Sequence, residues 1–182
     1  MRPAATLRPR STALITSPDR QSLRGRAGWR FVFRHPAHTV AIGFGSGLFP
    51  FAPGTAGTLF ALLAFAPLAA LTGDWLVTIL VAVSVVGIWA CEVTGKALGA
   101  ADHGAIVWDE IVAFWWVLLL TPNTPVWQAA AFVLFRLFDI WKPSPIGEFD
   151  RRYKNGFGVM LDDILAGFYT LLVLALARRF MV

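Results

Sequence analysis

Cysteine and charged side chains are scarce in this chain of 182 residues. Cys91 is the single cysteine, which excludes an intrachain disulfide and a cysteine-rich metal site. Charged residues make up 15% of the chain, whereas a soluble domain usually has about a quarter. Hydrophobic residues make up 57%, and the mean hydropathy is +0.62. A chain with so few polar side chains cannot cover a globule in water, so we predict an integral membrane protein.

Acidic residues are nearly missing from the first 40 residues, which hold eight arginines and one acid, Asp19. Residues 41–182 hold eight basic and ten acidic residues, so the basic character belongs to the N-terminal part. Beside a membrane body, such a tail favours anionic lipid headgroups and cytoplasmic retention, and we expect no nucleic acid partner. We therefore divide the chain into a disordered or interfacial basic tail, 1–40, and a membrane domain, 41–182.

A sequence repeat of 20–50 residues is also missing, which excludes a solenoid. Residues 43–58 are so rich in glycine and proline that we predict an ordered loop there, because neither a helix nor a strand tolerates that density. Several of the apolar segments that follow are shorter than the roughly 20 residues of a full crossing. We predict an all-α membrane protein, a compact bundle of four to five transmembrane helices preceded by this loop. The apolar segments are approximately 56–72, 75–91, 105–121, 126–141 and 158–177.

The distribution of basic residues predicts the orientation of the bundle. Positive flanks stay inside, so the tail and residues 142–157 are expected on the cytoplasmic side. The turns at 71–74 and 121–125 are then outside. Arg178 and Arg179 also fall outside, against the rule, and a tilted or re-entrant last segment would remove this conflict. In this orientation the glycine loop and the acids at the segment ends gather at one membrane face.

Carboxylates interrupt the apolar segments near these inner ends. A charged residue inside an apolar helix costs roughly 2.5–3.5 kcal/mol on insertion scales, yet two pairs of adjacent acids occur there. Helix capping could explain one acid of each pair, and ion pairing with Arg136 or Lys142 could absorb one carboxylate, after which three or four mutually repelling acids remain. The remaining acids call for a cation, and oxygen ligands without cysteine fit Mg²⁺ or Mn²⁺ better than Zn²⁺. The acids are Asp109, Glu110, Asp139, Asp162 and Asp163.

The glycine loop supplies a second half of the predicted site. Backbone N–H groups of such a loop, at the start of a helix, bind phosphate well, although a tight membrane turn is an alternative. With a divalent cation nearby, a phosphate ester becomes the natural ligand and metal-assisted hydrolysis the natural reaction. His103 could serve catalysis or form only an interfacial hydrogen bond. A transporter or ion pathway that uses intramembrane carboxylates is the rival function, which the one-sided acids and the missing repeat disfavour.

Four sequence blocks resemble the phosphatidylglycerophosphatase A family of bacterial membrane lipid phosphatases. The resemblance implies Mg²⁺-dependent removal of the terminal phosphate from phosphatidylglycerol phosphate, which yields phosphatidylglycerol in phospholipid biosynthesis. It also implies a multi-pass protein of the bacterial inner membrane with its active site facing the cytoplasm. The blocks are GFGSGLFPFAPGTAGT at 43–58, DHGAIVWDE at 102–110, FRLFDIWKPSPIGEFDRR at 135–152 and GFGVMLDDILAG at 156–167.

The resemblance further implies roles for individual residues, in addition to a lipid substrate and the bilayer as partners. The metal ligands would be Asp109, Glu110, Asp139, Asp162 and Asp163. The catalytic groups would be Asp109, Glu110, Asp163, Lys142 and His103. The substrate would be bound by Ser46, Gly47, Gly54, Thr55, Arg136, Lys142 and Arg151. The long tail 1–40 departs from the usual short start of the family.

Overall fold

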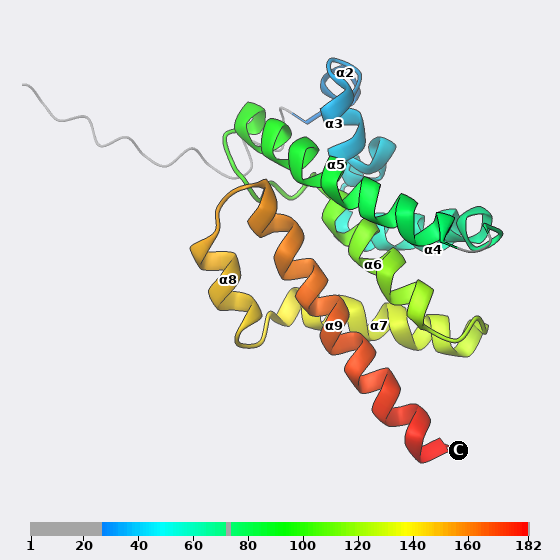
Figure 1. The fold of residues 1–182 in the computed structure, drawn as a ribbon. Coiled ribbons are helices and arrows are strands. Elements are labelled where there is room, and N and C mark those ends of the chain that lie inside the picture. The colour runs from blue at the N-terminus through cyan, green and yellow to red at the C-terminus, as the bar shows by residue number, and fades with distance from the viewer. Residues whose placement is uncertain (1–26, 72–73, 182) are drawn as a thin grey trace, which may run out of the picture.

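The computed structural model in Figure 1 describes residues 27–71 and 74–181. Most of the predicted tail, and the middle of the turn predicted at 71–74, lie outside these residues. Every regular element within them is helical, which confirms the predicted all-α class for this part of the chain. The elements are α2 (Trp29–Val32), α3 (Pro36–Ala41), η1 (Gly43–Leu48), α4 (Pro53–Ala69), α5 (Trp75–Leu98), α6 (Trp108–Leu120), α7 (Pro125–Trp141), α8 (Ile146–Arg152) and α9 (Gly156–Met181).

The five longest helices, α4, α5, α6, α7 and α9, correspond to the five predicted apolar segments. Proline occupies the first turn of α4 and of α7, where its missing N–H costs no hydrogen bond. α5 extends beyond the predicted end at residue 91, to Leu98, and stops where Gly99 adopts a left-handed conformation (φ 75°). Glycine at this position is a common helix terminator, because it adopts positive φ without strain.

Short helices occupy the end of the predicted tail and the segment before α4. Two of them, α2 and α3, lie within residues 29–41, where the sequence analysis predicted no helix. The predicted ordered loop begins with the 3₁₀ turns of η1, inside which Phe44 and Gly45 have positive φ values of 55° and 105°. Gly45 also faces the ring of Trp29, so a side chain at this position would collide with it.

The centre of the bundle is α6, which packs against α4, α5, α7 and α9. Its side chains Ile111, Val112, Phe114 and Val117 are fully buried. An indole N–H also ties α6 to a neighbour, because Trp115 Nε1 donates to the Ala61 carbonyl of α4 at 2.9 Å. A helix surrounded on most sides by other helices is expected to be apolar all round, so acids at its start need a specific reason.

Among the residues that the structure describes, two helices are long and apolar enough to cross a membrane, namely α5 over Trp75–Leu98 and α9 over Gly156–Phe180. α4 is apolar but shorter. Large hydrophobic side chains remain exposed on the outer faces of these helices, including Leu63, Val85 and Phe168. These features support membrane association. α9 is one continuous helix, so the re-entrant form considered for the last segment is wrong.

The helix ends are sorted between two sides of the bundle (Figure 1). The ends of α4 and α5 that are joined to each other lie on the right of the view, as does the turn between α6 and α7. The first turns of α6 and α9 and the last turn of α7 lie away from that side. The bundle therefore brings the predicted inner ends of these segments together.

Candidate active site

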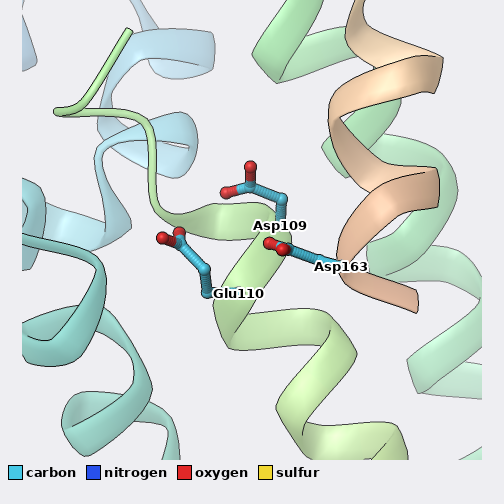
Figure 2. A group of neighbouring side chains, drawn as sticks. All are labelled: Asp109, Glu110 and Asp163. Carbon is cyan, nitrogen blue, oxygen red and sulfur yellow. The ribbon is translucent and has the colours of Figure 1, made fainter. Parts of the chain in front are cut away.

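Three carboxylates from two helices meet where α6 and α9 begin (Figure 2). Asp109 and Glu110 occupy the first turn of α6, and Asp163 projects from the second turn of α9 toward them. One oxygen of each carboxylate lies within 4.8 Å of the others. Asp109 is 6% exposed and Asp163 is 3% exposed, so water cannot solvate these charges well. We call Asp109, Glu110 and Asp163 the acidic trio.

Neighbouring residues hold the start of α6 in place. The amide of Val107, just before the helix, donates to the Ala41 carbonyl at 2.9 Å. The indole Nε1 of Trp108 donates to the Val83 carbonyl of α5 at 3.1 Å. With its first turn anchored to two elements, α6 presents Asp109 and Glu110 at its positive dipole end, which offsets part of their charge.

Several carboxylate oxygens near the trio have no donor. Within the described part of the chain, Asp109 Oδ1, Glu110 Oε2 and Asp162 Oδ1 are buried and lack a hydrogen-bond partner. A buried acceptor left unpaired costs about 1–3 kcal/mol, and more when it is charged. Oxygen atoms of this kind, converging from two helices, are the ligands that hard divalent cations prefer. The residues present therefore fit Mg²⁺.

Asp139, predicted as a metal ligand, is held by a cation of its own helix. Arg136 Nη1 lies 2.8 Å from Asp139 Oδ2, and the same nitrogen lies 3.7 Å from Glu110 Oε1. It also donates to the Thr58 hydroxyl of α4 at 3.3 Å. Asp139 still borders the trio, because its carboxyl is a close electrostatic neighbour of Asp163. Arg136 thus organises the acids, and its guanidinium is engaged on several sides.

Asp162, another predicted ligand, is paired with Lys142. Lys142 ends α7 in a left-handed conformation (φ 45°), and its Nζ lies 2.5 Å from Asp162 Oδ2 and 3.3 Å from Asp150 Oδ1. Burial by itself would lower the pKa of Lys142, but the carboxylate of Asp162 outweighs it and raises the pKa above its usual range. The side chain is therefore a permanent cation at the edge of the site.

Asp150 on α8 lies on the other side of Lys142. Partial burial would raise the pKa of Asp150, but the hydrogen bond from Lys154 and the charge of Lys142 lower it. Of the five predicted acids, Asp139 and Asp162 thus have their own cations, whereas Glu110 of the trio shares Arg136 with Asp139 at 3.7 Å.

The glycine loop reaches the acids through Gly54 in the first turn of α4. A Cβ atom at this position would collide with Glu110 Oε1 and lie 2.9 Å from Arg136 Nη2, so only glycine allows the helix to approach this closely. Thr55 follows and is half-buried. Ser46 lies earlier in the loop, where its hydroxyl donates to the Gly43 carbonyl at 2.9 Å.

A cavity of about 260 Å³ adjoins this part of the loop. Gly47 and Pro53 line it from the loop, and His103 and Gly104 line it from the connection between α5 and α6. His103 is buried, and its Nδ1 accepts the Ala105 N–H at 3.2 Å. Arg151, predicted to bind substrate, is exposed on α8, where its guanidinium lies near Gly147.

Three residues that contact the site were not predicted from the sequence. Thr58 binds Arg136, Asp150 binds Lys142, and Glu92 of α5 accepts the backbone N–H of Gly156 at 2.6 Å. Asp150 lies inside one of the four blocks, but a partly exposed acid beside basic residues is common on any helix. The partners of Thr58 and Glu92 lie more than 60 residues away in sequence, so no local spacing could have shown them.

The family profile described as Phosphatidylglycerophosphatase A matches residues 39–178. The chain belongs to the phosphatidylglycerophosphatase A family. Phosphatidylglycerophosphatase A of Escherichia coli (strain K12) is 44% identical over 146 residues, which cover 76% of this chain and 81% of that protein. Phosphatidylglycerophosphatase A of Haemophilus influenzae is 45% identical over 141 residues, which cover 76% of this chain and 86% of that protein.

A third relative of this phosphatidylglycerophosphatase A family member has a different name. A protein of Bacteroides thetaiotaomicron, provisionally named phosphatidylinositol-3-phosphatase, is 42% identical over 149 residues, which cover 76% of this chain and 91% of that protein. No solved structure matches the chain. The family match confirms the resemblance drawn from the four sequence blocks.

Proposed function

We propose that this chain hydrolyses the terminal phosphate monoester of phosphatidylglycerol phosphate and yields phosphatidylglycerol, a step of phospholipid biosynthesis. Membership of the phosphatidylglycerophosphatase A family supports this activity, as do the relatives from Escherichia coli and Haemophilus influenzae that carry the family name. The observation that supports the mechanism is the acidic trio, whose buried oxygens include two without a donor in the described residues.

Asp109, Glu110 and Asp163 would hold the Mg²⁺ ion, with Asp162 and Asp139 beside them as further ligands. When bound, the ion polarises the phosphoryl group and lowers the pKa of water. The chain contributes the negative charge that retains the ion, and Arg136 keeps Glu110 and Asp139 in place.

The groups around the trio would place the phosphate and move protons. Lys142 offers a permanent positive charge to the phosphate at the edge of the site, and the first turn of α4 offers backbone N–H groups at a distance that Gly54 makes possible. A carboxylate of the trio accepts a proton from the attacking water as the bond from phosphorus to the glycerol oxygen breaks.

The leaving glycerol oxygen needs a proton in return. His103 lines the cavity beside the loop, where its Nδ1 accepts the Ala105 N–H. We assign the protonation of the leaving group to His103 and the cavity to the glycerol part of the substrate headgroup. Gly47, Ser46 and Thr55 shape the loop on this side, and exposed Arg151 is available to the headgroup from α8.

We place the bundle across the bacterial inner membrane, with four to five crossings and the active site at the cytoplasmic face. The length and apolar surface of α5 and α9 support membrane insertion. Arg30 and Arg34 before the loop, and the basic residues of α8, belong to the segments that the positive-inside rule assigns to the cytoplasm. A transporter would need acids near the bilayer midplane, whereas the trio lies in the first turn of α6 and the second turn of α9.

The test is phosphate release from phosphatidylglycerol phosphate by the purified full chain in mixed micelles. We expect activity with Mg²⁺, loss of activity in excess chelator, and recovery when Mg²⁺ is restored. Activity that survives complete removal of divalent cations would refute the metal-assisted mechanism. Phosphatidylinositol 3-phosphate serves as the competing substrate, because the Bacteroides relative is named for it. A higher kcat/KM on that lipid would refute the proposed substrate but leave the site in place.

A further inference from the structure

α5 contributes none of the five predicted acids, yet it contacts both helices that carry the trio. Trp108, the residue before Asp109, donates its indole N–H to the Val83 carbonyl of α5. At Gly87 of α5, an added Cβ would lie 2.7 Å from Trp108 Cδ1 and 3.1 Å from Met160 Sδ. α6 and α9 therefore press against the same stretch of α5, through residues one position before Asp109 and three positions before Asp163.

A hydrogen bond between Glu92 and Gly156 fixes the beginning of α9 on α5. Glu92 Oε2 accepts the N–H of Gly156, the first residue of α9, at 2.6 Å. The backbones are also unusually close, because a Cβ at Gly156 would lie 2.7 Å from the amide nitrogen of Glu92. A carboxylate at this point also complements the positive end of the α9 dipole.

Local capping of α9 has another source. Asn155 Oδ1 accepts the Gly158 N–H at 2.9 Å, which satisfies a second free amide of the first turn. That bond lies within three residues and leaves the helix free to move as a unit. The bond to Glu92 joins residues 64 positions apart, so it determines where α9 lies relative to α5.

We propose that Glu92 is a positioning residue, which sets Asp163 at the correct place opposite Asp109 and Glu110 by holding the first amide of α9. Gly156 and Asp163 are seven residues apart, or about 10 Å along a rigid helix, so a shift at one end reaches the other. This inference rests on the proposed metal site. Residues that orient metal ligands typically contribute about 10–100-fold to metal affinity.

The experiment compares Glu92→Ala, Glu92→Gln and Lys96→Gln in the full chain in detergent micelles. The first measurement is hydrogen exchange of the backbone amides at 156–160 in excess chelator, and the second is Mn²⁺ binding followed by electron paramagnetic resonance. Glu92→Ala should exchange faster and bind Mn²⁺ about 10-fold more weakly. Glu92→Gln keeps an oxygen acceptor for the Gly156 N–H, so its Mn²⁺ affinity should stay within about three-fold of the wild type. The small remaining loss reflects the replacement of a charge-assisted hydrogen bond by a neutral one.

Lys96→Gln is the matched control. The Lys96 side chain is 76% exposed and contacts Glu92 Oε1 at 2.8 Å, whereas Gly156 donates to Oε2. The substitution therefore removes the ion pair of Glu92 and keeps its hydrogen bond to Gly156. It should resemble the wild type in both measurements. Equal Mn²⁺ affinity and equal exchange in Glu92→Ala and the wild type would refute the positioning role. A Glu92→Gln variant that binds Mn²⁺ about 10-fold more weakly than the wild type would also refute it, and this comparison with the wild type decides the matter if Glu92→Ala fails to fold. If the wild type binds no Mn²⁺ but Glu92→Ala still exchanges its amides faster than the wild type, the metal site is refuted instead.

Discussion

Replacing Asp163 with asparagine should abolish phosphate release and at the same time stabilise the metal-free protein. The oxygens of the trio lie within 4.8 Å of each other, so each pair of charges repels by about 3 kcal/mol at an effective dielectric constant of about 20. Asparagine keeps the shape of the side chain and removes one charge, which relieves two of these repulsions. After relaxation and residual solvation, we expect the free energy of unfolding in chelator to rise by about 1–3 kcal/mol.

The loss of activity has a different cause. Without the Asp163 charge, the trio has one anionic ligand fewer, and one candidate for the proton acceptor is gone. We expect kcat to fall by at least about 100-fold at saturating Mg²⁺. Phosphate release measures this loss. Unfolding is followed with a thiol-reactive fluorescent dye, because Cys91 is the single cysteine of the chain and is buried until the bundle opens.

The control for this prediction is Asp74→Asn. Asp74 is exposed at the start of α5, so its replacement should change neither phosphate release nor stability measurably. An Asp163→Asn variant that is less stable than the wild type in chelator would mean that the trio does not repel as its geometry requires. A variant that keeps near-normal activity would mean that Asp163 is a structural acid.

Other substitutions test the surroundings of the trio. Gly54→Ala forces a methyl group against Glu110 Oε1, so we expect lower activity and a free energy of unfolding lower by about 1–3 kcal/mol in the same dye assay. Gly28→Ala is the control, because a methyl group there meets no atom within 4 Å and should be neutral. Lys142→Gln leaves Asp162 buried without its cation and should cost about 3 kcal/mol in unfolding free energy. Because the pKa of Asp150 is lower in the folded protein, its carboxylate stabilises the fold above the unfolded pKa of about 3.9. This stability is lost as the pH falls through the folded pKa. Asp150→Asn should therefore flatten the acid limb of the stability curve, where the free energy of unfolding falls with falling pH. A steeper acid limb in that variant would contradict this assignment.

Local patterns in the sequence were enough for the class of the protein and for its main helices. Five apolar runs predicted α4, α5, α6, α7 and α9, because the length and composition of a run are local properties. The short helices α2, α3 and α8 were not predicted, since segments of four to seven residues carry too little periodicity and depend on the contacts around them. The number of membrane crossings stays a prediction.

The acids themselves were also visible in the sequence, because adjacent carboxylates inside apolar runs are costly wherever the chain folds. Their division into partners was not. The sequence allowed an ion pair with Arg136 or Lys142 for one acid but did not show which acids would remain, whereas the folded chain pairs Asp139 with Arg136 and Asp162 with Lys142 and leaves Asp109, Glu110 and Asp163 as the trio. The pairing of Asp162 with Lys142 and the convergence of the trio depend on distances of a few ångströms between atoms of different helices, which sequence spacing does not supply.

The sequence by itself thus determined that this chain is an apolar helical protein with a surplus of negative charge near its helix ends, and its blocks pointed to the family. Only the tertiary structure decided which three carboxylates converge and which residues hold them there. Gly54 lets α4 approach Glu110, and Glu92 holds the start of α9 from a position 64 residues away. These contacts form only when the helices pack, because each joins groups that have no relation along the chain.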